Sequence, residues 1–132
     1  MPTFTTIYEE HNHIFSLLTD LKAQAEDHPP TDIAADSAAI TGIGTLLEYA
    51  AMHFTHEEEM MKNLNFFDYD GHCETHALFN KMAAQLYNTL LDDPSYIEDV
   101  IRIFTNWFKT HIEIETFLFA RAVSRANRKS TT

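Results

Sequence analysis

The sequence predicts an all-α fold, an up-down-up-down four-helix bundle. Three observations carry this prediction: the 132 residues are 45% hydrophobic with only 3 Gly and 4 Pro, the apolar residues recur every three or four positions, and three breaks, two of which contain Pro, separate four long stretches. Few Gly and Pro combined with this period favour long helices over many short strands. Four helices with short connections pack antiparallel in sequence order. We therefore expect one domain over residues 1–132.

Capping and stop signals predict the helix ends. Capping boxes at Thr6–Glu9 and Ser95–Glu98 predict the starts of the first and fourth helices. His28-Pro29-Pro30 must end the first helix, and Asp92-Asp93-Pro94 the third. The other expected boundaries are a second helix from between residues 31 and 37 to about residue 64, a third over about 70–91, and a fourth that fades near residue 127.

Each predicted helix has one core-facing stripe, called here its seam, whose residues follow one another at alternating steps of three and four. In chain order the four seams are Ile7, His11, Ile14, Leu18, Leu21, Ala25; Ile43, Leu46, Ala50, His53, Glu57, Met60, Leu64; His72, His76, Phe79, Ala83, Leu86, Leu90; and Ile97, Ile101, Phe104, Phe108, His111, Glu115, Leu118, Ala122. The polar seam residues are His11, His53, Glu57, His72, His76, His111 and Glu115. In the predicted topology, all of them converge at about one level of the bundle.

This convergence predicts a metal site. A buried carboxylate without a partner is very costly, so two of them among five imidazoles require a cation or a dense hydrogen-bond network. Seven ligands are too many for one zinc ion, which is satisfied by about four. Mixed imidazole and carboxylate ligands suit iron or manganese, whereas calcium and magnesium prefer oxygen ligands.

A ferritin-like two-metal site is the alternative for a helical bundle, and it needs two Glu-x-x-His motifs. Only Glu10 and His13 have this spacing, and neither lies on a seam. The sequence therefore disfavours that site. His13, His28 and His56 also lie off the seams, and we expect them to be solvated.

Four short motifs occur in order at helical spacing. They are His11 with Ile14-Phe15, the run His53-Phe54-Thr55-His56-Glu57-Glu58, the pair His72-x-x-x-His76, and Trp107-x-x-x-His111-Ile112. Together they resemble the hemerythrin family over nearly the whole chain. The resemblance implies two iron ions joined by an oxo or hydroxo bridge. It assigns His72, His76 and His111 to one iron and His11 and His53 to the other.

The resemblance further implies that Glu57 and a carboxylate of the fourth helix bridge the irons, and that the iron with two histidines has an open position for dioxygen. Oxygen carriers of the family have an aspartate five residues after the fourth-helix histidine, where this chain has Thr116. Glu115, at plus four, is similar to a His-x-x-x-Glu variant of other members, some linked to sensing or peroxide chemistry. We expect Glu115 to be the second bridge.

The resemblance makes this a non-haem di-iron protein that binds dioxygen reversibly, for storage, delivery or sensing. The resemblance favours a binding or sensing protein over an enzyme. The alternatives are a di-iron peroxidase or oxidase, a sensor of nitric oxide or redox state, and, more remotely, a metal-free helical interaction module.

The surroundings of the site should be apolar. A dry pocket is expected beyond the ligands, lined by Ile14, Phe15, Leu18, Leu46, Ala50, Phe104 and Phe108. Tyr49 is interpreted as a packing residue more readily than as a donor to a bound ligand, and Trp107 is expected to pack against the site.

The composition disfavours several classes of binding partner and of fold. The formal net charge of −11 disfavours nucleic acid and anionic membranes, which need a basic face. A single cysteine, Cys73, excludes an internal disulfide framework. The first residues lack the basic and apolar regions of a signal peptide, so we expect a cytoplasmic protein whose partner is dioxygen or another small ligand.

Overall fold

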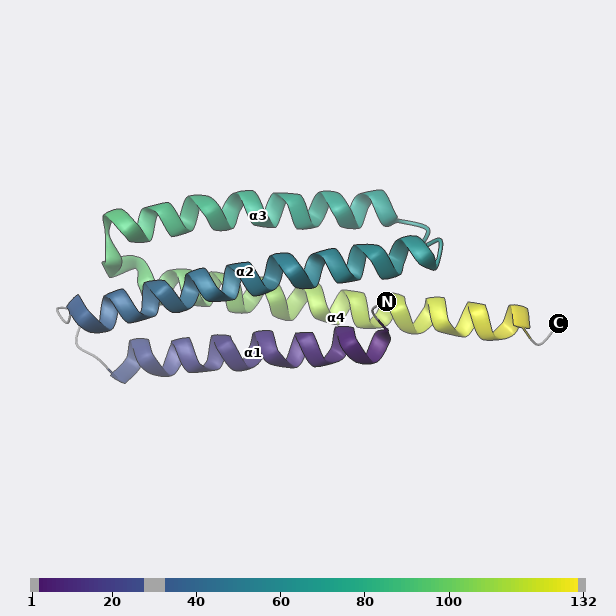
Figure 1. Ribbon diagram of the computed structural model, residues 1–132, viewed down its shortest axis with the longest axis horizontal. Coiled ribbons are helices and arrows are strands. Elements are labelled where there is room, and N and C mark those ends of the chain that lie inside the picture. The colour runs from purple at the N-terminus through teal and green to yellow at the C-terminus, as the bar shows by residue number, and fades with distance from the viewer. Residues whose placement is uncertain (1–2, 28–32, 131–132) are drawn as a thin grey trace.

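The computed structural model describes residues 3–27 and 33–130, apart from the side chains of residues 27, 33–36, 123 and 126–130. Its helices are α1 (Phe4–Asp27), α2 (Ile33–Asn63), α3 (Tyr69–Asp92) and α4 (Ile97–Ser130), with a one-turn 3-10 helix, η1 (Pro94–Tyr96), before α4. The four long helices run alternately up and down, and the last part of α4 extends beyond the bundle (Figure 1). No strand occurs in the described ranges, so the all-α four-helix prediction is confirmed.

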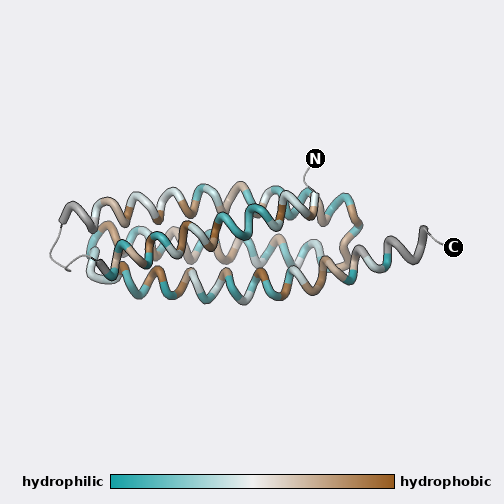
Figure 2. The backbone as a smooth tube through the Cα atoms, turned by 90° about the horizontal axis from the view of Figure 1, so that it is seen from below, coloured by the Kyte–Doolittle hydropathy of each residue, from teal (hydrophilic) through white to brown (hydrophobic). Residues whose placement is uncertain are grey.

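The hydrophobic core has two parts, and hydrophobic positions recur along every helix (Figure 2). The larger cluster runs from Ile14, Phe54, Phe79 and Phe108 toward the α3–α4 connection. The smaller cluster, at the end where α2 meets α3, contains Ile7, Met60, Met61, Phe66 and Phe119. The polar seam residues lie between these two clusters in every helix, so they form a polar layer across the bundle.

The helix starts differ from the predicted capping boxes. The Thr6 amide donates a hydrogen bond to the Thr3 hydroxyl at 3.2 Å, so Thr3 caps α1 and the predicted start at Thr6 is wrong. The Ser95 amide donates to the Asp93 carboxylate at 3.0 Å, so Asp93, and not Ser95, caps the turn before α4. The fourth helix also continues past the predicted residue 127 to Ser130. The start of α2 at Ile33 lies within the predicted window, whereas His28-Pro29-Pro30 lies outside the described residues.

The turn between α2 and α3 explains one error in the predicted core. Asn65 has a φ of 52°, in the left-handed region that Asn tolerates better than most residues. The Phe66 amide donates to the Met61 carbonyl at 2.9 Å and the Asn65 amide to the Lys62 carbonyl at 3.1 Å, a Schellman motif. Because α2 ends here, Leu64 is exposed and was wrongly predicted as core, whereas Met61 is buried.

Most other seam positions are buried as predicted, and the buried stripe is wider than the seam. Phe54, Val100 and Phe119 are buried although they lie beside the seam positions. A helix in a bundle buries positions that flank the a/d stripe, which explains these additions.

The turn gives a test of the Schellman assignment. We expect Asn65→Gly to leave the free energy of unfolding nearly unchanged, because Gly adopts positive φ at no steric cost. Asn65→Val should lower it by about 1–2 kcal/mol, because a β-branched residue is strained there. Urea unfolding of both variants measures the difference, and equal stabilities would contradict the assignment.

Candidate metal centre

The polar layer contains two overlapping groups of possible metal ligands. One group is His11, His53, Glu57 and Glu115, and the other is Glu57, His76, His111 and Glu115. Within each group, one ligand atom per residue lies within 4.8 Å of all the others, and every member is buried. Ligands about 2.1 Å from a shared ion are separated by at most about 4.2 Å, so a small inward movement would satisfy one ion per group.

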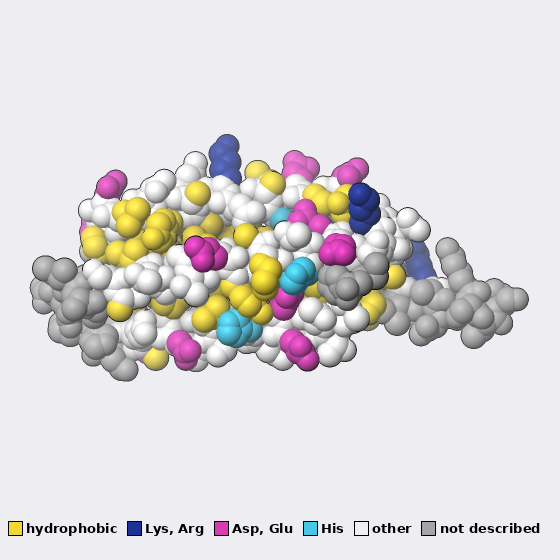
Figure 3. All heavy atoms as spheres, in the orientation of Figure 1, with side chains coloured by type: hydrophobic (Ala, Val, Ile, Leu, Met, Phe, Trp, Pro, Cys, Tyr) yellow, Lys and Arg dark blue, Asp and Glu magenta, His cyan; other side chains and the backbone are white. Residues whose placement is uncertain are grey.

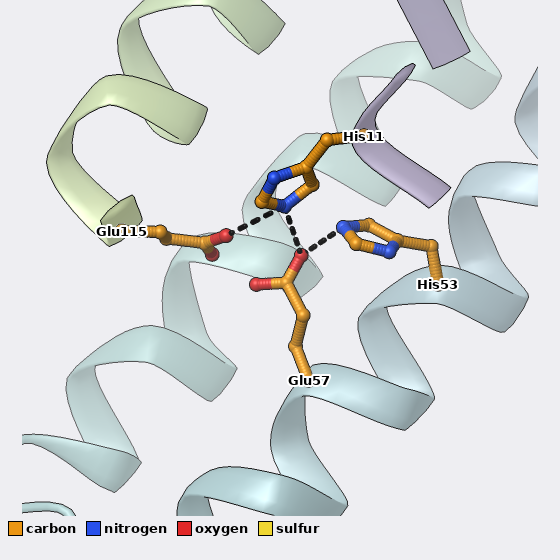
Figure 4. A group of neighbouring side chains, drawn as sticks. All are labelled: His11, His53, Glu57 and Glu115. Atoms are coloured by element: carbon orange, nitrogen blue, oxygen red, sulfur yellow. Dashed lines mark ion pairs between the residues drawn. The ribbon is translucent and has the colours of Figure 1, made fainter. Parts of the chain in front are cut away.

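Glu57, on α2, directs its two carboxylate oxygens toward different histidines. Its Oε1 contacts His53 Nε2 and lies 3.6 Å from His11 Nε2, as Figure 4 shows. Its Oε2 lies 3.8 Å from His76 Nε2, in the second group. One carboxylate therefore faces both groups.

Glu115, on α4, repeats this arrangement from the opposite side. Its Oε2 lies 3.5 Å from His11 Nε2, across from Glu57 (Figure 4). Its Oε1 contacts His111 Nε2 and lies 3.3 Å from His76 Nε2. Thr116, the neighbouring residue, is exposed. The helix geometry thus turns Glu115, and not Thr116, into the core.

His72 lies at the edge of the centre. It is buried in the first turn of α3, its ring centroid is 6.4 Å from that of His111, and its ring meets Phe66 edge-on. It belongs to neither group in the described residues. The structure therefore brings together six of the seven predicted ligands and places the seventh beside them.

Aromatic rings hold the histidines of the second group. Phe54 stacks on His76 at 4.1 Å between centroids, and Trp107 stacks on His111 at 4.5 Å. Phe54 also meets Trp107 edge-on at 5.8 Å. The predicted packing of Trp107 against the site is confirmed, whereas the role of Phe54 was missed because it lies off the seam.

The two central carboxylates share their protons unequally. Burial and the adjacent Glu115 raise the pKa of Glu57 well above its ordinary value. Burial also acts to raise the pKa of Glu115, but its contacts with Glu57, His11, His111 and His76 hold that pKa well below its ordinary value. Two carboxylates buried this close to each other favour retention of one proton by the pair in the metal-free protein. Burial lowers the pKa of His53 to about 4, so its imidazole is neutral and able to bind a metal at neutral pH.

Several residues outside the predicted ligand set differ from expectation. Glu10 is buried and hydrogen-bonded to His53 and His56 although it lies off the seam, so the seam pattern did not identify it. His56 is half-buried rather than solvated, because it pairs with Glu10 from the neighbouring helix. His13 is exposed as expected, and its ring contacts Tyr49 at 4.4 Å, consistent with a packing role for Tyr49. His28 lies outside the described residues.

The donor set fits a metal ion. Five buried ligand atoms have no hydrogen-bond partner in the described part of the chain: His11 Nε2, His53 Nε2, both Glu57 oxygens and Glu115 Oε2. Buried polar atoms are almost always partnered, so five unsatisfied atoms facing one volume indicate that a cation belongs there.

The fold and the site together define a helical-bundle protein with a buried histidine–carboxylate metal centre. The chain belongs to the hemerythrin family, because the family model described as the hemerythrin HHE cation binding domain matches residues 3–123.

Two relatives agree with this membership. They are hemerythrin-like proteins from Naegleria gruberi and Naegleria fowleri, each 28% identical over 105 residues, covering 80% of this chain and 72% of the relative. No solved structure matches significantly. No helix in the described ranges is long and apolar enough to cross a membrane.

We expect Glu57→Gln to act in opposite directions with and without metal. Because the folded-state pKa of Glu57 is raised, the metal-free protein loses stability as the pH rises from the ordinary carboxylate range through that pKa. Gln cannot ionise, so the metal-free variant should melt above the wild type at neutral pH. The metal-loaded variant should melt below it, because an anionic ligand is lost. Thermal unfolding across pH, with and without metal, measures both effects, and identical metal-free profiles would contradict the retained proton.

We expect His53→Ala to lose metal and to lower the melting temperature of the metal-loaded protein. Removing one partner of a buried charged cluster costs about 3–5 kcal/mol, which corresponds to about 10 °C or more for a domain of this size. His13→Ala is the matched control, because that histidine is exposed on α1. Metal analysis and calorimetry test the pair, and equal metal contents would place His53 outside the centre.

Proposed function

We propose that this protein holds two iron ions in one centre and binds dioxygen there reversibly. The observation that supports this proposal is the arrangement of Glu57 and Glu115, each of which directs one oxygen toward each ligand group. A carboxylate that faces two groups is suited to bridge two ions. If only one ion were bound, the second pair of buried histidines would have no metal to ligate.

The donor types favour iron. Each group combines two imidazoles with two shared carboxylates, and the nearby Cys73 belongs to neither group. Nitrogen and oxygen donors without thiolate suit iron or manganese better than structural zinc. The match to a cation-binding family agrees with a metal centre of this kind.

The ligands would be divided between the two ions as follows. His11 and His53 would hold one ion, His76 and His111 the other with His72 within reach, and the two glutamates would bridge. Two ferrous ions would supply two electrons together to dioxygen. The bridging carboxylates would offset about half of the ions' positive charge, which a low-dielectric core tolerates better.

The surrounding residues would keep the site dry. Glu57 and Glu115 are 0% exposed, and Ile14, Ala50, Phe104 and Phe108 are buried in the adjoining cluster. Exclusion of water limits protonation and loss of a bound reduced ligand. We place the dioxygen position beside His11 and His53, the half with fewer imidazoles within reach.

A second candidate is a di-iron peroxidase or oxidase, or a sensor of nitric oxide or redox state. The observation that favours it is the inward orientation of Glu115, which resembles the fourth-helix variant linked to such chemistry. A cytoplasmic location, and the absence of nucleic-acid and membrane partners, stay predictions.

We expect two iron atoms per chain in protein produced with adequate iron. Anaerobic reduction followed by air should give an absorbance change that reverses when oxygen is removed, and azide should compete for the same position. One tightly held zinc ion would overturn the two-iron proposal. Irreversible oxidation with consumption of added peroxide would favour the second candidate.

A further inference from the structure

Glu10 is a buried carboxylate that the ligand groups do not contain. It lies on α1 directly before His11, is 6% exposed, and points toward α2. The His53 Nδ1–H donates to its Oε1 at 2.9 Å, and the His56 Nδ1–H donates to its Oε2 at 2.6 Å. No Lys or Arg among the described residues pairs with it, so these two imidazoles are its charge-stabilising partners.

This contact determines how His53 faces the centre. A carboxylate can only accept a hydrogen bond, so the proton of the neutral His53 ring is on Nδ1. Its Nε2 then has a free lone pair directed at Glu57 Oε1, inside the first ligand group. Imidazole ligands of metals commonly have their second nitrogen held in this way.

His56 holds Glu10 from the outside. It lies one turn after His53 on α2, and its side chain is 33% exposed. Figure 3 shows histidine side chains at the surface beside acidic ones, midway along α1 and α2. Glu10 is thus fixed between a buried imidazole and a half-exposed one, and this pair of contacts ties α1 to α2 at the level of the centre.

In the part of the chain that the structure describes, His76 has no equivalent contact in the other half of the centre. Glu58 Oε2 lies 3.8 Å from His76 Nδ1, which is beyond hydrogen-bond distance, and its side chain is 29% exposed. Of these two sides, and within the described residues, it is the His53 side that has a buried carboxylate at hydrogen-bond distance behind the ligand. A carboxylate acceptor increases the electron density that an imidazole donates to a metal.

We infer that Glu10 is a positioning residue of the metal centre, held by His56, which fixes His53 with Nε2 inward and makes it a stronger donor than the ligands of the other half. This inference rests on the proposed metal centre. It assigns to Glu10 a role in iron affinity and in the reduction potential at the half where we place dioxygen.

The test compares Glu10→Gln, which keeps an acceptor and removes the charge, with Glu10→Leu, which removes both at similar size. We expect iron affinity to fall in the order wild type, Gln variant, Leu variant, by about 10-fold to 100-fold overall. The reduction potential of the Gln variant should rise, and its azide spectrum should shift. His56→Ala should show a smaller change in the same direction.

Two controls separate positioning from packing. Glu9→Gln removes the same charge from the neighbouring residue, whose side chain is exposed, and should leave iron affinity and spectrum unchanged. Metal-free Glu10→Gln keeps an acceptor of the same size for the His53 Nδ1–H and should melt close to the wild type, so a loss of iron affinity in that variant reports positioning and not packing. Metal-free Glu10→Leu leaves this buried N–H without an acceptor and should melt below the wild type.

The outcomes are distinguishable from those of the proposed function. Wild-type protein that takes up no iron overturns the proposed function and this inference together. Wild-type protein that holds two irons, with Glu10 variants of unchanged affinity, potential and spectrum, overturns this inference alone.

Discussion

Two carboxylates buried against each other are the constraint on which the rest of the structure depends. Glu57 and Glu115 are fully buried, so leaving both ionised without a cation would cost several kcal/mol. The surrounding imidazoles and one retained proton reduce this cost, and metal ions would remove it. Because the two glutamates and their histidines come from all four helices, every helix must have its polar residues at one level. The polar layer between the two hydrophobic clusters is the result.

The same constraint links folding to metal binding. A metal that binds both carboxylates must displace the proton that the pair retains, so binding becomes stronger as the pH rises toward neutrality. Aromatic rings limit how far the ligands can move in the metal-free protein. Phe54 on His76 and Trp107 on His111 restrict both rings, so this half of the site is largely formed before metal arrives. Such preorganisation lowers the entropy lost on binding.

The periodicity of the sequence was sufficient to predict the bundle and the inward orientation of Glu115, because a seam position follows directly from helix geometry. The helix caps were not predictable in this way. Several Thr, Ser and Asp residues lie near each helix start. Only the backbone geometry of the folded chain shows that Thr3 and Asp93 are the caps. Glu10 was missed for a different reason: it lies beside the seam, and only the rotation of α1 against α2 brings it to His53. That the seven polar residues ligate metal stays a prediction.

The unequal surroundings of the two halves bear on how one centre could bind dioxygen at one side. If both ions had equivalent ligands, neither would be the preferred position for a third molecule. Here His53 is backed by a buried carboxylate at hydrogen-bond distance, whereas the carboxylate behind His76 is more exposed and lies 3.8 Å away. In the proposed di-iron centre, His72 would add a third imidazole on the His76 side, which would leave the His11–His53 side with fewer ligands and a more electron-rich histidine. Fewer ligands would provide an open position there, and stronger donation would favour transfer of electron density to the molecule that occupies it.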